Sequence, residues 1–223
     1  MVKDNIARVF ERINSASARA KIDPSGVRII AVSKGRQVKD IEDALACGLN
    51  EIGENRVQEA ALKHSDKRLN RYIPLVKWHM IGHLQMNKVR DAVKIFDLIH
   101  SVDSLRLAYE IDSQAAKIGK VQDILIEVKT SPEATKSGFL PGEISEAIDK
   151  ISGLRNASLK GLMTIAPLSG APEDARPYFS LLRSLRDKFN KGFSLSMGMT
   201  DDFEIAIEEG ANMVRIGRAI FDS

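Results

Sequence analysis

The sequence has little cysteine, no long apolar run and no large excess of charge of either sign. A lone cysteine, Cys47, can form neither an internal disulfide nor a cysteine-based zinc or iron–sulfur site. Lys and Arg number 33 and Asp and Glu 30, and the resulting net charge of +3 is too small to indicate nucleic-acid binding. No apolar run approaches the roughly 20 residues that cross a bilayer, and the segment from Met1 to Ala20 lacks the apolar core of a signal peptide. These absences predict a cytoplasmic protein that binds neither nucleic acid nor a membrane.

The composition is that of a globular protein. Hydrophobic residues make up 43% and charged residues 28% of the 223 residues, which excludes wholesale disorder. We expect one domain over residues 1–223, because α/β barrels of roughly 200–250 residues are usual as single domains.

Short β-branched runs alternate with helical patterns along the whole chain. Asp4–Ala20 has apolar residues at helical spacing, and Val27–Val32 is typical of a strand buried on both faces. Further strands are predicted at Glu51–Gly53, Lys77–Ile81, Leu98–Ser101, Ile124–Lys129, Leu159–Met163, Phe193–Ser196 and Met213–Ile216. The helices predicted between them are Val38–Ala46, Arg56–Lys63, Gln85–Ile95, Ser104–Lys117, Pro141–Ile151, Glu173–Asn190 and Asp202–Glu208.

This alternation predicts a parallel sheet with right-handed crossovers. Eight βα units in about 200 residues favour an α/β fold in the form of a single (β/α)8 TIM barrel, here with an extra N-terminal helix. The alternative is a doubly wound open sheet, which usually has fewer strands at this length. In a barrel, functional residues gather at the carboxyl ends of the strands.

Lys34 follows the first strand and is the first candidate at such an end. A lysine in a dry barrel mouth loses the solvation of its ammonium form, and the neutral amine attacks carbonyls to form a Schiff base. The alternative is a lysine that reaches solvent or pairs with a carboxylate such as Glu54.

Two glycine-containing loops at the ends of the last two strands indicate an anion site. Ser196–Asp202 has hydroxyls and backbone N–H groups ahead of a predicted helix, and within Val214–Arg218 the strand is followed directly by Gly217. Barrels often bind phosphate between the loops after strands seven and eight. The alternative is a capped helix and a tight turn with two solvated arginines. A lysine opposite a phosphate site is the arrangement that pyridoxal phosphate (PLP) chemistry requires.

The histidines do not indicate a metal site. His79 and His83 are four residues apart, but His79 lies in a predicted strand and Gly82 interrupts the regularity between them. No third ligand is near in sequence and no H-E-x-x-H pattern is present. We therefore expect no metal.

Six motifs stand in the order typical of one family: Ala31–Lys34, Gly53–Glu59, Trp78–Lys88, Gly161–Thr164, Leu195–Phe203 and Val214–Gly217. With them the sequence closely resembles the pyridoxal phosphate homeostasis proteins (the YggS/PROSC family), from about Arg28 to Phe221. The resemblance implies a barrel like the N-terminal domain of bacterial alanine racemase, with PLP held as an aldimine on Lys34.

The resemblance also implies the other cofactor contacts. Asn55 would lie near the cofactor, and His79 and Met163 would line the ring pocket. The phosphate would be surrounded by Ser196, Thr200 and the turn of Gly217 and Arg218. Arg215 would reach the phosphate or the pyridine nitrogen. The chain departs from the family pattern at Gly35-Arg36-Gln37 and at Lys129, positions that leave the lysine itself untouched.

The family's role implies a carrier that buffers PLP (vitamin B6) and delivers it to PLP-dependent apo-enzymes, without robust turnover and without catalytic residues. The alternative is a PLP-dependent amino-acid racemase or decarboxylase. Racemisation needs a proton acceptor on each face of the substrate; in alanine racemases the second is a tyrosine from a further domain, for which we expect no room here. The tyrosines Tyr72, Tyr109 and Tyr178 lie outside the predicted strand ends. A third class is a barrel enzyme that binds another phosphorylated metabolite without a Schiff base.

Overall fold

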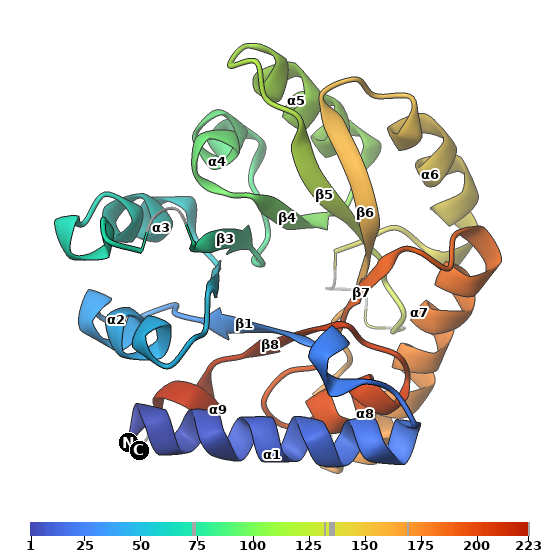
Figure 1. Ribbon diagram of the computed structural model, residues 1–223. Helices are drawn as coiled ribbons and strands as arrows, with labels where there is room; N and C mark the ends of the chain where they lie inside the picture. Colours follow the sequence, from blue (N-terminus) through green and yellow to red (C-terminus); the bar gives the residue numbers. More distant parts are fainter. Residues whose placement is uncertain (73–74, 132, 134–136, 169, 223) are drawn as a thin grey trace.

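Eight parallel strands close into a barrel in the computed structural model, which describes residues 1–72, 75–131, 133, 137–168 and 170–222 (Figure 1). Each strand pairs with the next along the chain, and β8 pairs back to β1. The strands are β1 (Arg28–Val32), β2 (Glu51–Glu54), β3 (Lys77–Met80), β4 (Leu98–Val102), β5 (Gln122–Glu127), β6 (Ala157–Met163), β7 (Ser194–Ser196) and β8 (Met213–Ile216). The predicted barrel is confirmed, and the open-sheet alternative is wrong.

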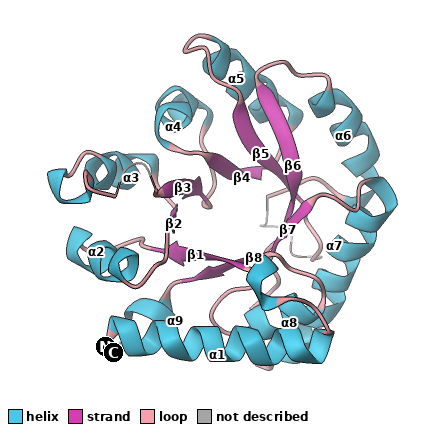
Figure 2. Ribbon diagram, viewed as in Figure 1, coloured by secondary structure: helices cyan, strands magenta, loops and turns pink. Residues whose placement is uncertain are grey.

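Helices surround the barrel and cover its outer face (Figure 2). The α-helices are α1 (Val2–Ala20), α2 (Val38–Ala46), α3 (Val57–His64), α4 (Val89–Ile95), α5 (Leu105–Ala116), α6 (Ile144–Ser152), α7 (Arg176–Phe189), α8 (Phe203–Glu208) and α9 (Arg218–Phe221). Short 3-10 turns lie at η1 (Pro24–Gly26), η2 (Lys67–Leu69), η3 (Met86–Lys88), η4 (Pro141–Glu143) and η5 (Pro172–Ala175). The sequence did not predict α9, η1 or η2, because three or four residues are too short to show a helical period. The turns η3, η4 and η5 lie at the starts of helices that the sequence predicted.

The helix predicted over Gln85–Ile95 is divided in the structure. Its first turn is the 3-10 turn η3, and the α-helix α4 begins only at Val89. This shorter α4 leaves the chain between β3 and α4 free to form one wall of a cavity, described below.

The main hydrophobic core lies between the strands and the surrounding helices. Side chains alternate along each strand, so Trp78 and Met80 of β3 face the helices while His79 between them faces the barrel interior. Parallel strands are covered on both sides in this architecture, which explains their almost continuous burial.

The N-terminal helix α1 packs against α8 and α9. Its buried residues include Ile6, Val9 and Ile13, at the helical spacing that the sequence predicted. The amide of Asn5 donates hydrogen bonds to the carbonyl oxygens of Ile220 (3.0 Å) and Asp222 (2.9 Å). The two ends of the chain therefore lie side by side (Figure 1). None of the described helices is both long enough and apolar enough to span a bilayer.

Candidate functional site

The carboxyl ends of three neighbouring strands bring Lys34, Asn55 and Gly217 to one edge of the barrel. In the register of β1 with its neighbours, Ala31 lies beside Ile216 and Val32 beside Gly53. Lys34 and Gly35 form a turn after β1, and the Lys34 side chain is exposed. The sequence predicted a lysine in a dry mouth; Lys34 is exposed because it lies two residues beyond the last residue of its strand.

A buried ion pair supports the Lys34 turn. Lys63 of α3 is only 6% exposed, and its ammonium group donates to Glu54 Oε1 (2.6 Å) and to the carbonyl oxygen of Ser33 (2.5 Å). The Ser33 hydroxyl also donates to Glu54 Oε1 (2.5 Å). Burial raises the pKa of the Glu54 carboxyl, and the hydrogen bonds from Lys63 and Ser33 oppose this effect. Glu54 thus pairs with Lys63, and the expected alternative of a Lys34–Glu54 pair is not what the structure shows.

The other side of the turn is fixed by Glu59 of α3. Its Oε1 accepts a hydrogen bond from the backbone N–H of Gly35 (2.5 Å) and another from Lys63 (2.6 Å). Gly35 has φ of +70°, a conformation that suits glycine. Both residues that flank Lys34 are therefore bound to one cluster of charged side chains, and the departure from the family pattern at Gly35 is part of this arrangement.

A chain of hydrogen bonds crosses the barrel interior from β8 to β3. Arg215 Nη1 donates to Ser196 Oγ (2.6 Å), which lies 2.8 Å from His100 Nδ1, and His100 Nε2 lies 2.9 Å from His79 Nδ1. The second guanidinium nitrogen of Arg215 donates to the carbonyl oxygen of Thr164 (2.9 Å).

Ser196 Oγ accepts from Arg215, because a guanidinium group can only donate. One set of tautomers continues the chain from there: the Ser196 hydroxyl donates to His100 Nδ1, and His100 Nε2 donates to His79 Nδ1. In these tautomers the proton of His79 is on Nε2, which lies 3.3 Å from Glu51 Oε2.

The pKa values agree with neutral histidines inside the barrel. Burial lowers the pKa of His79 to about 3 and that of His100 well below the ordinary value. Burial also lowers the pKa of Arg215 to about 10, an effect that the carboxylates of Asp202 and Glu127 oppose, so the guanidinium stays charged at neutral pH.

Three residues expected around the cofactor lie in the barrel interior. Ser196 is fully buried and already bonded to His100 and Arg215. Met163 is buried with the apolar cluster of Leu98, Leu125 and Met213. His79 lines a cavity of about 250 Å³ together with residues that begin β1 and β3, at the opposite end of the barrel from Lys34.

The loops after β7 and β8 hold the remaining predicted phosphate residues together. The hydroxyl of Thr200 accepts from the backbone N–H of Ala219 (3.4 Å), and the backbone N–H of Arg215 donates to Gly198 (3.0 Å). Arg218 is exposed and pairs with Asp201. The expected alternative of two solvated arginines is wrong for Arg215, which is 4% exposed.

Glu127, at the end of β5, is a mouth residue that the sequence analysis missed. It lines a cavity of about 270 Å³ at the carboxyl ends of the strands, together with Asn55 and Thr130. Burial raises the pKa of its carboxyl to about 7; Asp103 adds to this effect and Arg215 opposes it. The signal in the sequence was a carboxylate directly after the apolar run of residues 124–126, and His100 directly after Leu98 and Ile99 was the same kind of signal.

The histidines His79 and His83 point to different places. His79 faces the interior, whereas His83 is exposed and its Nδ1 lies 3.1 Å from Asp103 Oδ2. Within the described residues, no cluster of three or more His, Cys, Asp or Glu side chains is arranged to hold a metal ion.

Comparison with known proteins places this geometry in a family. The family model of the alanine racemase N-terminal domain matches residues 6–223. The pyridoxal phosphate homeostasis protein of Aquifex aeolicus is 43% identical over 224 residues, which cover 98% of this chain and 96% of the relative. The chain belongs to the pyridoxal phosphate homeostasis protein family. The resemblance carried by the six motifs is thereby confirmed.

Other members of the pyridoxal phosphate homeostasis protein family agree. The Pseudomonas aeruginosa protein is 38% identical over 221 residues, covering 99% of this chain and 94% of the relative. The structure of PipY from Synechococcus elongatus without PLP has a TM-score of 0.85 at 34% identity, covering 99% of this chain and 100% of PipY. PipY with PLP bound has a TM-score of 0.82 over the same shares of both chains. Alanine racemase of Clostridium difficile shares the fold, with a TM-score of 0.74 at 17% identity. The match covers 98% of this chain and 56% of the racemase chain.

Proposed function

We propose that this chain binds PLP covalently through Lys34 and acts in the cytoplasm as a carrier that maintains PLP (vitamin B6) homeostasis, with residues 1–223 working as one unit. The observation that carries the proposal is the exposed amine of Lys34 on a turn whose two flanking residues are bound to Lys63, which is buried, and Glu59, which is half-buried. The names of the relatives and the PLP bound to PipY support it.

The residues at this end of the barrel fit the cofactor. PLP supplies an aldehyde that condenses with a primary amine, with loss of water, and a phosphate that carries negative charge. Lys34 provides the amine, and Asn55 lies on the neighbouring strand end. The hydroxyl of Thr200 and the turn of Gly217 and Arg218 provide hydrogen-bond donors and positive charge for the phosphate.

Arg215 provides a buried positive charge beneath the mouth. We propose that His79 and Ser196 act through Arg215, because the hydrogen-bonded chain holds its guanidinium in place and neither side chain is free at the rim. Met163 supports the pocket from below as part of the interior apolar cluster.

A carrier must also release its cofactor. The exposure of Lys34 leaves its amine open to solvent and to competing amines, which suits transfer of PLP to apo-enzymes. An enzyme would instead exclude water and present a second base. Among the described residues, no tyrosine lines the cavities around Asn55 at the carboxyl ends of the strands.

A PLP-dependent racemase or decarboxylase is the second candidate, and Glu127 is the observation that favours it. A carboxyl group with a pKa of about 7 at the barrel mouth is suited to accept and return protons near neutral pH. The two candidates therefore differ in whether Glu127 takes part in turnover.

Borohydride reduction followed by peptide mapping tests the cofactor site. We expect the purified protein to be yellow and the reduced cofactor to be attached to Lys34, and Lys34→Ala to lose the absorbance while remaining folded. Attachment to another lysine would overturn the assignment.

Exchange of the α-hydrogen of alanine in heavy water separates the carrier from the enzyme. The carrier predicts exchange no faster than with free PLP and a simple amine, together with transfer of PLP to an added apo-enzyme. Saturable, stereospecific exchange that is lost in both Lys34→Ala and Glu127→Gln would establish the enzyme instead.

A further inference from the structure

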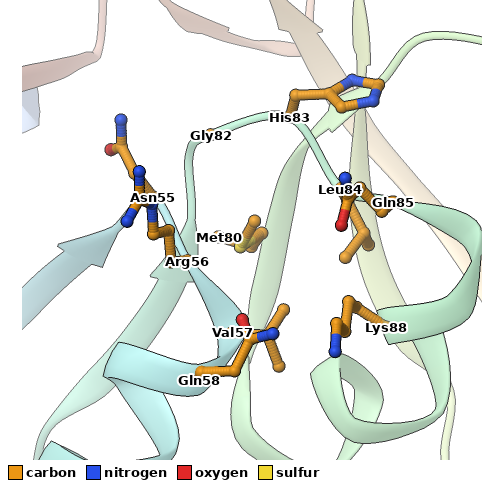
Figure 3. A pocket seen from close by; sticks show the side chains of 10 residues that line it. All are labelled: Asn55, Arg56, Val57, Gln58, Met80, Gly82, His83, Leu84, Gln85 and Lys88. Carbon is orange, nitrogen blue, oxygen red and sulfur yellow. The ribbon is translucent and has the colours of Figure 1, made fainter.

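A second cavity, of about 550 Å³, lies outside the barrel between the start of α3 and the chain that joins β3 to α4. Asn55 and Arg56 lie on one side of it and Gln85 and Lys88 on the other, with Met80 between them (Figure 3). Because Met80 points away from the barrel interior, the floor of this cavity lies outside the barrel, while Asn55, Gly82 and His83 form a rim that it shares with the cavity at the mouth.

The lining of this cavity is cationic and contains no carboxylate. Arg56 and Lys88 line it, and the side chain of neither forms a hydrogen bond or an ion pair with another residue in the described part of the chain, although the charge of Arg56 helps to lower the pKa of the Glu59 carboxyl on α3. By contrast, Arg90, which follows two residues after Lys88 but does not line the cavity, pairs with Asp91 (3.7 Å). Two unpaired cations on opposite sides of a hollow favour a negatively charged ligand.

The floor of the same cavity is apolar. It is formed by the buried side chains of Val57, Met80 and Leu84. The amide side chains of Gln58 and Gln85 also line the cavity. A volume of about 550 Å³ is within the range of small-molecule sites. The ligand that matches this surface has an apolar body and an anionic group.

The cavity adjoins the barrel mouth through a close backbone contact. A Cβ atom on Gly82 would lie 2.5 Å from the carbonyl oxygen of Asn55 and 2.8 Å from its Cα, so only glycine allows the two strand ends to approach this closely. Asn55 lines both this cavity and the one at the mouth that contains Glu127.

We propose that the cavity between α3 and α4 binds a small organic anion, a carboxylate or a phosphate ester with an apolar body, between Arg56 and Lys88. Binding there shifts the segment that carries Asn55 and thereby changes how firmly PLP is held. The binding step is independent of the proposed function, whereas the effect on PLP rests on it.

The binding step is tested by titrating the ¹⁵N-labelled full chain, without PLP, with phenyl phosphate, benzoate and the neutral benzyl alcohol. We expect the amide signals of Gly82 and Gln85 to move with one or both anions and not with the alcohol. The stronger of the two anions tells whether the site prefers a phosphate or a carboxylate.

Matched variants locate the probe. Arg56→Gln and Lys88→Gln should each weaken binding about tenfold, the effect of one charge-assisted hydrogen bond, while Arg90→Gln leaves it unchanged. If binding is lost in Thr200→Ala but retained in Arg56→Gln, the probe occupies the proposed phosphate site and the proposal is wrong. Absence of any shift at Gly82 with either anion also overturns it.

The effect on the cofactor is measured as the rate at which PLP leaves the loaded protein. A saturating probe should change this rate at least threefold in the parent protein, and Lys88→Gln should need about ten times more probe for the same change. An unchanged rate in the parent, with the probe bound, overturns the coupling. A protein that takes up no PLP overturns the proposed function, while the titration still decides the binding step.

Discussion

The barrel interior and the cavity between α3 and α4 each have an arginine, but the two side chains differ in their hydrogen-bond partners. Inside the barrel, Arg215 donates to Ser196 and Thr164, and its hydrogen bonds extend through two histidines. In the outer cavity, Arg56 forms no such bonds to described residues. Buried polar groups are costly unless they are satisfied, so a fully bonded cation positions other groups, whereas an unpaired one near solvent remains available to a ligand.

The largest expected effect comes from breaking the buried pair beneath Lys34. Lys63→Met leaves the Glu54 carboxyl buried without its cation, and loss of one partner of a buried pair costs about 3–5 kcal/mol of unfolding free energy. PLP attachment to Lys34 should also slow, because the turn loses its support. Urea unfolding and the rate at which absorbance appears after PLP is added measure the two effects.

A double variant separates charge from packing. Lys63→Met combined with Glu54→Gln should recover part of the lost stability, because no ionisable group then remains buried without a partner. Equal stability of the single and double variants would show that the pair is not the source of the effect.

Replacing the two compared arginines should have unequal consequences. Arg215→Gln removes a buried, charge-assisted donor worth about 1–3 kcal/mol, so PLP retention should weaken roughly tenfold to a hundredfold. Arg56→Gln should leave PLP retention unchanged in the absence of an added anion. Equilibrium dialysis measures the affinity of each variant for PLP. Equal losses of affinity in both variants would show that the two arginines do not differ in their effect on PLP binding.

Glu127 gives a pH-dependent effect of intermediate size. Its pKa in the folded protein, about 7, is above the ordinary value of 4.5. Its contribution to stability is therefore fully present below pH 4.5 and is lost as the pH rises through 7. Glu127→Gln should remove this pH-dependent loss. The difference in unfolding free energy between the variant and the parent should therefore be larger at pH 8 than at pH 5, by on the order of 1–2 kcal/mol in favour of the variant.

The control for Glu127 is Glu146 on α6. Its hydrogen bond from Lys150 lowers the pKa of its carboxyl, so Glu146→Gln should not gain stability as the pH rises. A gain of equal size in both variants would point to the net charge of the protein rather than to the barrel mouth.

The smallest effect is expected at an exposed ion pair. The side chains of Lys39 and Asp43 are 72% and 46% exposed and their charged groups lie 3.3 Å apart. Lys39→Met should change the unfolding free energy by less than about 0.5 kcal/mol, because solvent screens such pairs. A loss as large as that of Lys63→Met would mean that burial does not decide the value of these pairs.

Strand periodicity and strand-end position were sufficient to predict the barrel and the gathering of Lys34, Asn55 and Gly217. They did not predict what lies between strands far apart in the chain. His100 and Ser196 meet across the interior because of the register with which the barrel closes, and no local pattern encodes that register. The Lys63 cluster depends in the same way on how α3 packs beneath the turn. The exposure of Lys34 was missed because it depends on the path of two residues beyond the strand.

The hydrogen bonds of Asn5 reach Ile220 and Asp222, which follow it in the chain by 215 and 217 positions. During synthesis, α1 therefore leaves the ribosome long before α8 and α9, against which its apolar face packs. The apolar face of α1 therefore has no packing partner until nearly the whole barrel has been translated. Contacts between residues so far apart in the chain slow folding and leave partly folded chains prone to aggregation. The neighbouring ends also make the barrel suited to circular permutation, in which a short linker joins Asp222 to Val2 and new ends open in a surface loop.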